Sequence, residues 1–215
     1  MSVNLQKGQK VDLTKGNAGL SRVMVGLGWD EAKPAMSQSK GLFGGLFGGG
    51  GGQQNQDIDC DAIAFLLDSN GKIASKNDVV FFNNLKHPSG CVIHQGDNLT
   101  GAGDGDDEQI LVDLARLPAQ YDRVVMLVSI YKASERGQHF GMIENAFIRL
   151  VDAANGKELC KYNLSENYNG MTAMVFGEIY RRNGEWKFNA IGQPLQIWGV
   201  AQLAEKYGLP LSNWR

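Results

Sequence analysis

The sequence has few cysteines and few histidines. Its 215 residues include three of each. Cys60, Cys91 and Cys160 lie far apart, match no zinc-binding or disulfide spacing, and each falls in an apolar stretch. We therefore interpret all three as reduced, packed side chains, which are typical of a protein in the reducing cytosol.

Long hydrophobic runs are also missing. No stretch approaches the roughly 20 apolar residues that a membrane-spanning helix needs. The first 13 residues, MSVNLQKGQKVDL, lack the apolar centre of a secretory signal. A formal net charge of -2 gives no reason to expect nucleic-acid binding. We predict a cytoplasmic protein that binds no nucleic acid.

Recognisable catalytic arrangements are absent as well. His87, His94 and His139 fall in separate segments, and no serine or cysteine has the context of a nucleophile elbow. The glycines of residues 101–105 lack the Lys-Ser/Thr of a phosphate-binding loop. We predict structural or surface roles for the histidines, no catalytic residues and no residues that bind an organic cofactor.

The sequence does contain a series of short runs rich in β-branched and aromatic residues. Asn155-Gly156 and Asn183-Gly184 each separate two such runs, and Asn-Gly favours tight hairpins because both residues accept positive φ. Strands at short spacing, without long crossover helices, predict a mostly β fold, namely an antiparallel β-sandwich with few short helices. One helix is expected near the C-terminus, at residues 200–207, ending at Gly208. The expected strands include residues 20–29, 62–68, 78–84, 91–98 and 123–131.

Residues 33–56 break this pattern. They contain KGLFGGLFGGGGGQQNQ, which has too little side-chain volume and too much backbone freedom for a stable element. We predict a flexible, glycine-rich insertion within a single domain that spans residues 1–215. Its two Leu-Phe pairs, at residues 42–43 and 46–47, leave room for a peripheral contact with a membrane or a partner.

Carboxylates are concentrated in two segments. Asp57, Asp59 and Asp61 occupy every second position where the chain enters an expected strand, so their side chains would share one face of that strand. Residues 97–108 hold five acidic side chains and no basic one, interleaved with glycines. Like charges this close repel each other unless a cation lies among them.

Calcium is the cation that suits these residues best. It takes about six to eight oxygen ligands from carboxylates, amides, hydroxyls, carbonyls and water, and residues 97–108 offer every protein oxygen in that set. Surroundings rich in carboxylate and free of sulfur favour calcium or magnesium over zinc or copper. The helix-loop-helix pattern is absent, because Ala62 and Asp68 stand where it would require Gly and Glu. We therefore predict one or two Ca²⁺ ions bound by loops of the sheets.

Several long segments resemble the TerD family, the calcium-binding tellurium-resistance and stress proteins of bacteria. The likeness covers nearly the whole chain apart from residues 33–56. It implies a β-sandwich with calcium bound at loops on one edge, a link to resistance against tellurite, other oxidants and DNA-damaging agents, and no established catalytic activity. The sequence departs from the family pattern at residues 33–56 and at the C-terminal residues 192–209. The similar segments are LQKGQKVDLTK, VGLGWD, DIDCDAIAFLLDSNGK, GDNLTGAGDGDDEQILVDL, GQHFGMIENAFIRLVD and TAMVFGEIYRRNGEWKFNAIGQP.

The resemblance also implies the metal ligands. Asp61 is either a further ligand or a cap of its strand, and Asp30 is a candidate outer ligand. The implied ligands are Asp57, Asp59, Asp97, Asn98, Thr100, the Gly103 carbonyl, Asp104, Asp106, Asp107 and Glu108.

We favour a calcium-binding module, not an enzyme, that presents a surface to protein partners in a stress or resistance complex. A metal-dependent hydrolase that uses the same acidic cluster stays open as the alternative. It would need an open coordination position and a second acidic or histidine group facing that position. In a third interpretation, the protein is structural and calcium only stabilises the sandwich.

Replacing residues 36–54 by a short Gly-Ser linker tests the interpretation of the insertion. The free-energy cost of closing a loop changes by only about 0.6 kcal/mol per doubling of its length, so we expect nearly unchanged melting and calcium affinity. Failure of the shortened protein to fold would mean that the insertion packs against the sandwich. Vesicle sedimentation with and without the segment checks for membrane contact.

Overall fold

The computed structural model describes residues 2–17, 19–31, 58–96, 105–164, 166 and 168–214, so the predicted insertion lies outside the described residues. Short 3₁₀ turns occur at Lys76–Asp78, Phe140–Met142 and Leu211–Trp214. The strands and helices are β1 (Val3–Leu5), β2 (Lys10–Asp12), β3 (Arg22–Glu31), β4 (Cys60–Leu67), β5 (Val79–Val80), β6 (Val92–His94), β7 (Glu108–Asp113), β8 (Arg123–Ile130), α1 (Ala133–Arg136), β9 (Ile143–Asp152), β10 (Glu158–Asn163), β11 (Ala173–Arg182), β12 (Glu185–Leu195) and α2 (Val200–Lys206).

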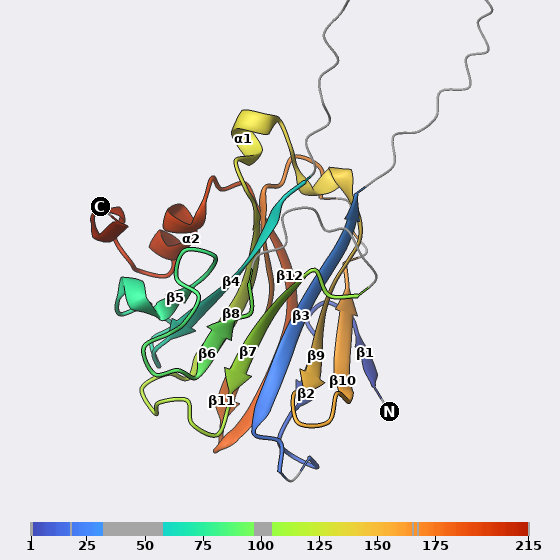
Figure 1. Cartoon of the computed structure of the whole chain (residues 1–215), viewed down its shortest axis with the longest axis vertical. Helices are drawn as coiled ribbons and strands as arrows, with labels where there is room; N and C mark the ends of the chain where they lie inside the picture. Colours follow the sequence, from blue (N-terminus) through green and yellow to red (C-terminus); the bar gives the residue numbers. More distant parts are fainter. Residues whose placement is uncertain are drawn as a thin grey trace, which may run out of the picture.

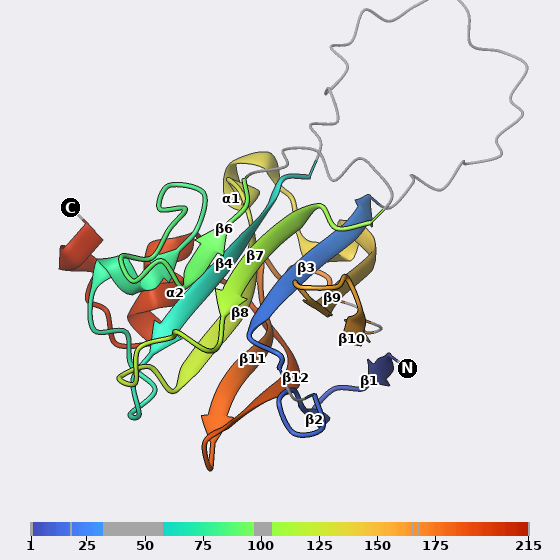
Figure 2. The ribbon, with the colours of Figure 1, turned by 60° about the horizontal axis from the view of Figure 1, so that its bottom comes forward.

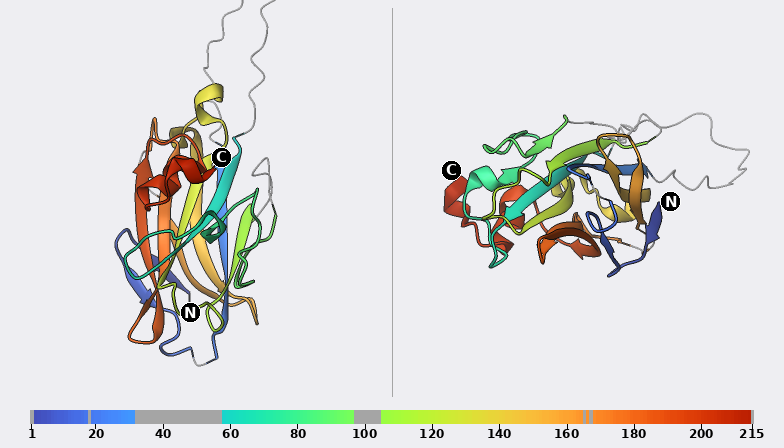
Figure 3. Two further views of the ribbon diagram at one scale, coloured as in Figure 1. Left: turned by 90° about the vertical axis from the view of Figure 1, so that its left-hand side faces the viewer. Right: turned by 90° about the horizontal axis from the view of Figure 1, so that it is seen from below.

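The strands form two sheets that pack face to face (Figures 1 and 3). Sheet A has the strand order β1-β10-β9-β3-β7-β6, and sheet B has the order β2-β12-β11-β8-β4-β5. Neighbouring strands of the described sheets are antiparallel except β1 and β10, which run parallel. The predicted mostly β sandwich, with few short helices and one of them near the C-terminus, is therefore confirmed, and one parallel pair is added to it.

The main hydrophobic core fills the space between the two sheets. Along β4, alternate side chains such as Ala62 and Leu66 point into this core, whereas Ile63 and Phe65 point to the outer face of sheet B. There they pack with Leu203 of α2 in a second hydrophobic cluster. Because both faces of β4 are buried, its residues from Ala62 to Leu67 form a continuous apolar run and not an alternating one.

The predicted turns form where the residues allow positive φ. Asn183 and Gly184 adopt φ of 54° and 78° and join β11 to β12. Gly156, with φ of 73°, lies in the turn between β9 and β10. At the C-terminal helix, Gly208 has φ of 91° directly after the last turn of α2, as its position in the sequence predicts.

Two strands are shorter than the sequence suggested. The run at residues 78–84 yields only β5, because Phe81 and Asn84 close a tight turn through reciprocal backbone hydrogen bonds. The Asn84 side chain also donates to the Val79 carbonyl at 2.7 Å. The run at residues 91–98 yields only β6 among the described residues. As a result, β5 pairs with β4 at Ala64 and Phe65 alone.

The segment between β5 and β6 is held to the sandwich by a buried polar cluster. The Tyr121 hydroxyl donates to Asp78 Oδ1 at 2.7 Å, and His87 Nε2 lies 3.2 Å from the same oxygen. Burial, followed by the hydrogen bond to Asp78, raises the pKa of Tyr121 to about 12. His87 therefore has the structural role that its isolated position in the sequence predicts.

No helix in the described part of the chain is long and apolar enough to cross a membrane. α2 has seven residues, and it lies against the outer face of sheet B (Figure 1).

Truncation of Leu203 in α2 tests how much the second cluster stabilises sheet B. Leu203 is fully buried, so Leu203→Ala should lower the free energy of unfolding by about 2–5 kcal/mol. Exposed Glu205 on the same helix supplies the control, because Glu205→Ala should change this free energy by no more than about 0.5 kcal/mol. Urea unfolding measures both, and equal effects of the two substitutions would contradict the described packing.

Candidate metal site

Two acidic stretches of the sequence lie at the same end of the sandwich. β3 ends there, β4 and β7 begin there, and the end of β6 is close by (Figures 1 and 2). Of the predicted ligands, Asp59, Asp106, Asp107 and Glu108 belong to the described residues. Asp57, Asp97, Asn98, Thr100, Gly103 and Asp104 lie outside them. We refer to the set Asp59, Cys60, Asp61, Asp107 and Glu108 as the acidic corner.

Glu108 reaches from sheet A across to sheet B. It alternates with Ile110, which faces the core, so its side chain also points inward from β7. Its Oε2 accepts the backbone N–H of Ala62 in β4. The N–H groups of Ala62 and Ala64 point to the same edge of β4. β5 pairs with β4 only at Ala64 and Phe65, so it is too short to reach the Ala62 N–H. The Glu108 carboxylate therefore accepts the hydrogen bond that a longer β5 would otherwise accept.

His94 completes this contact. Its Nε2 lies 3.5 Å from Glu108 Oε2, and both side chains are fully buried. The sequence predicts a structural or surface role for His94, and no signal in it indicates the proximity of His94 to Glu108. Only the pairing of β6 with β7 brings the two residues together.

Asp107 ties the start of β7 to the end of β3. Its Oδ2 accepts the backbone N–H of Trp29 at 2.8 Å, and its own N–H donates to the Leu27 carbonyl at 2.8 Å. Burial raises the pKa of Asp107 above its ordinary value, and the charges of Asp30 and Asp106 act in the same direction. The Trp29 N–H opposes these effects by favouring the ionised carboxylate.

Asp106 points elsewhere. Its Oδ1 forms an ion pair with Arg149 Nε at 2.6 Å, and Gln109 Nε2 donates to its Oδ2 at 3.1 Å. The carboxylate lies directly over Gly26, where a Cβ would overlap it. Gly26 alternates with the core residues Val25 and Leu27, so Asp106 occupies the outer face of sheet A, opposite to Glu108. Glycine is required at residue 26 because the carboxylate fills the space a side chain would need.

The thiol of Cys60 is influenced by the charges of the acidic corner. Burial raises the pKa of Cys60 well above its usual range, and the next causes are all carboxylates, namely Asp61, Asp59, Glu108 and Asp107. Asp59, Asp61 and Glu108 are 7%, 4% and 2% exposed. Like charges buried side by side destabilise one another unless protons or a cation compensate for them.

The chemistry of the acidic corner suits a hard cation. Its Asp and Glu groups supply carboxylate oxygens, which calcium and magnesium prefer. Within the described ranges, however, no group of three or more His, Cys, Asp or Glu side chains is arranged to hold a metal ion. The described acids alone therefore do not form a metal site, and Asp106 is engaged by Arg149.

Comparison with known proteins gives a consistent result. The family model described as the TerD domain matches residues 1–207. The stress response protein SCP2 of Bacillus subtilis (strain 168) is 52% identical over 207 residues, which cover 96% of this chain and 100% of the relative. The tellurium resistance protein TerD of Serratia marcescens is 43% identical over 212 residues, which cover 99% and 100%.

A solved structure also shares the fold. It belongs to a homologue of telluride resistance protein (TerD) from Streptomyces coelicolor A3(2). It superposes with a TM-score of 0.63 at 22% identity and covers 89% of this chain and 100% of its own.

Removal of the Arg149 guanidinium tests the separate role of Asp106. Arg149→Met leaves a buried carboxylate without its ion-pair partner, so we expect a loss of about 1–3 kcal/mol in the free energy of unfolding. Arg123→Met is the matched control, because Arg123 pairs with Glu178 at an exposed position and should cost no more than about 1 kcal/mol. Denaturant unfolding distinguishes the two, and a loss as small as the control's would contradict a buried ion pair.

Proposed function

Because this chain belongs to the TerD family, we propose that it is a calcium-binding protein of tellurium resistance and general stress response. The names of its relatives, a stress response protein and a tellurium resistance protein, support the biological part of this proposal. The acidic corner supports the chemical part. The charges of four carboxylates raise the pKa of the Cys60 thiol, and three of these carboxylates belong to almost fully buried residues.

We assign the ligands according to which of the acids at the start of β7 lie at the acidic corner and which lies on the outer face of sheet A. Asp59, Asp107 and Glu108 lie at the acidic corner and would contribute carboxylate oxygens, together with the predicted ligands at residues 57 and 97–104. Asp106 would instead act as a brace, since its ion pair with Arg149 anchors the start of β7 to β9. Bound calcium would supply positive charge that offsets the repulsion among the carboxylates.

The residues of the acidic corner already connect three strands from both sheets. Glu108 links β7 to β4 through the Ala62 N–H, and Asp107 links β7 to β3 through the Trp29 N–H. An ion held by these carboxylates would therefore stabilise the junction of the two sheets and order the surrounding surface. We propose that this surface serves protein partners in the cytoplasm as a binding or scaffolding module.

We favour binding over catalysis. A hydrolytic mechanism needs a basic group that faces an open position beside the metal. His94 lies at this corner, and its side chain is fully buried against Glu108. The hydrolase alternative gains no support from this arrangement, and screening for phosphodiester and ester hydrolysis with calcium, magnesium and manganese tests it directly.

Calcium titration tests the proposal. An ion that binds only the folded protein stabilises it by about 2.7 kcal/mol at a hundredfold excess over Kd, so the melting midpoint should rise clearly when calcium replaces chelator. Calorimetry gives the number of ions and the affinity. Identical midpoints in calcium and chelator would refute calcium binding, and stabilisation by zinc alone would indicate a different metal.

Two neighbouring substitutions show where the ion binds. Asp107→Asn should weaken calcium binding about tenfold or more, because it removes a ligand charge at the acidic corner. Asp106→Asn removes the same charge one residue away but on the outer face of sheet A, so it should change affinity much less. A larger loss in Asp106→Asn than in Asp107→Asn would move the site to that outer face.

A further inference from the structure

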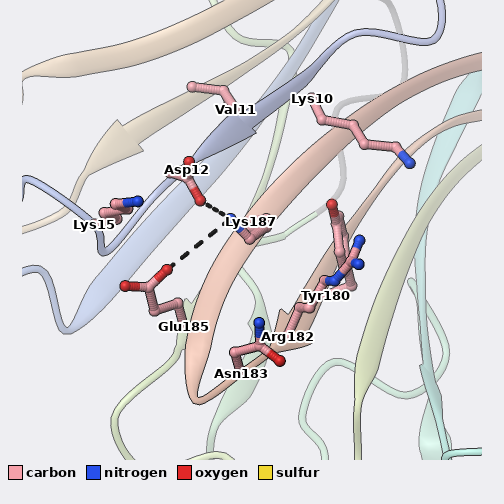
Figure 4. A pocket seen from close by; sticks show the side chains of 9 residues that line it. All are labelled: Lys10, Val11, Asp12, Lys15, Tyr180, Arg182, Asn183, Glu185 and Lys187. Atoms are coloured by element: carbon pink, nitrogen blue, oxygen red, sulfur yellow. Dashed lines mark hydrogen bonds and ion pairs between the residues drawn. The ribbon is translucent and has the colours of Figure 1, made fainter.

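A surface hollow of about 380 Å³ lies on the outer face of sheet B. It is formed by β2, the turn that follows β2, and the hairpin of β11 and β12 (Figure 4). This hairpin lies at the opposite end of the sandwich from the acidic corner (Figures 1 and 2). The hollow is therefore separate from the proposed calcium site.

The strand register explains why charged side chains gather there. Tyr180 of β11, Lys187 of β12 and Asp12 of β2 are direct neighbours across three strands, and Arg182 pairs with Glu185 in a nearby row. The intervening residues, such as Phe188, face the main core. Alternation along the strands therefore directs one polar set to the outside. The packing of α2 against sheet B involves Ile63, Phe65 and Val175 rather than these rows.

The charges in the hollow are unbalanced. Four basic and two acidic side chains line it, in a chain whose formal net charge is -2. Both acids are drawn to Lys187, whose Nζ forms an ion pair with Asp12 and lies 4.0 Å from Glu185 (Figure 4). Lys10, Lys15 and Arg182 have no ion-pair partner among the residues that the structure describes.

Neutral hydrogen-bond donors lie beside these positive charges. The Tyr180 hydroxyl and the Asn183 amide also line the hollow. Asn183 is held there by its positive φ in the hairpin turn. Arg181, the neighbour of Arg182, is by contrast engaged on the other face, where its guanidinium lies 4.6 Å from the Trp186 ring and donates to the Leu117 carbonyl at 3.2 Å.

We propose that this hollow binds a multiply charged phosphate group, either a free diphosphate or the di- or triphosphate of a small molecule. Arginine matches the oxygens of a phosphoryl group with two parallel N–H donors, and lysines supply point charges around it. Three cations from three separate elements suit several phosphoryl groups better than one. The volume lies within the range of roughly 300–1,000 Å³ that is typical of small-molecule sites.

Calorimetric titration with inorganic pyrophosphate in calcium-free buffer tests the proposal independently of the calcium site. We expect saturable one-to-one binding by the wild-type protein, with melting in the same buffer used to verify the fold. Lys15→Ala/Arg182→Ala should weaken this binding tenfold or more. Lys86→Ala/Lys206→Ala is the matched control, since it removes two exposed charges from other elements and should leave affinity unchanged.

Glu185→Gln provides a variant with the opposite expected effect. It removes a negative charge from the hollow while Asp12 still holds Lys187, so pyrophosphate should bind several-fold more tightly. This gain would not follow from a purely structural role of these residues. Equal losses in the two double variants, an unchanged affinity in Lys15→Ala/Arg182→Ala, or no saturable binding by the wild type would each overturn the proposal.

ATP as a second probe distinguishes the source of the phosphates. Binding of both ATP and pyrophosphate, with the same dependence on Lys15 and Arg182, supports recognition through the phosphate chain. Binding of ATP without binding of pyrophosphate would overturn the proposal, because it would mean that the adenosine part is recognised instead.

Discussion

The contact between Glu108 and the backbone of Ala62 is the interaction on which the arrangement of this end of the sandwich depends. It joins β7 of sheet A to β4 of sheet B at a point where β5 no longer covers the edge of β4. A buried carboxylate is a costly way to satisfy one N–H, because an ionised side chain loses its hydration when it is buried. The cost is reasonable if the same carboxylate also serves a cation. The structural contact and the proposed calcium site thus explain each other.

Acidic residues next to one another in sequence have different roles because the backbone turns between them. Asp106 lies over Gly26 and pairs with Arg149, whereas Asp107 bonds to the Trp29 N–H and Glu108 enters the space between the sheets. Gly105, with φ of 121°, precedes this change of direction. Of these three consecutive acids, Asp106 therefore braces β7 against β9, Asp107 connects β7 to β3, and Glu108 lines the acidic corner. The number of carboxylates in the sequence thus overstates the number that one ion at the acidic corner would meet.

The acidic corner and the basic hollow lie at opposite ends of the sandwich. The acidic corner lies where β3 ends and β7 begins, and the basic hollow lies beside the hairpin of β11 and β12 (Figure 1). Both surfaces depend on the same sandwich, but they are built from different strands and share no side chain. Such an arrangement would allow the proposed cation and the proposed anionic ligand to bind independently.

The sequence alone determined the fold class, because β-branched runs and Asn-Gly turns act locally through backbone preferences. The Asn183-Gly184 hairpin and the end of α2 at Gly208 are examples. From the acidic segments, composition and resemblance to a family also predict a metal site. Tertiary structure decided which acids converge. His94, the Ala62 N–H and Arg149 come from strands distant in sequence, and only strand pairing and sheet packing bring them to Glu108 and Asp106. No local pattern records such long-range contacts, because a side chain's partner depends on register and on the face it occupies.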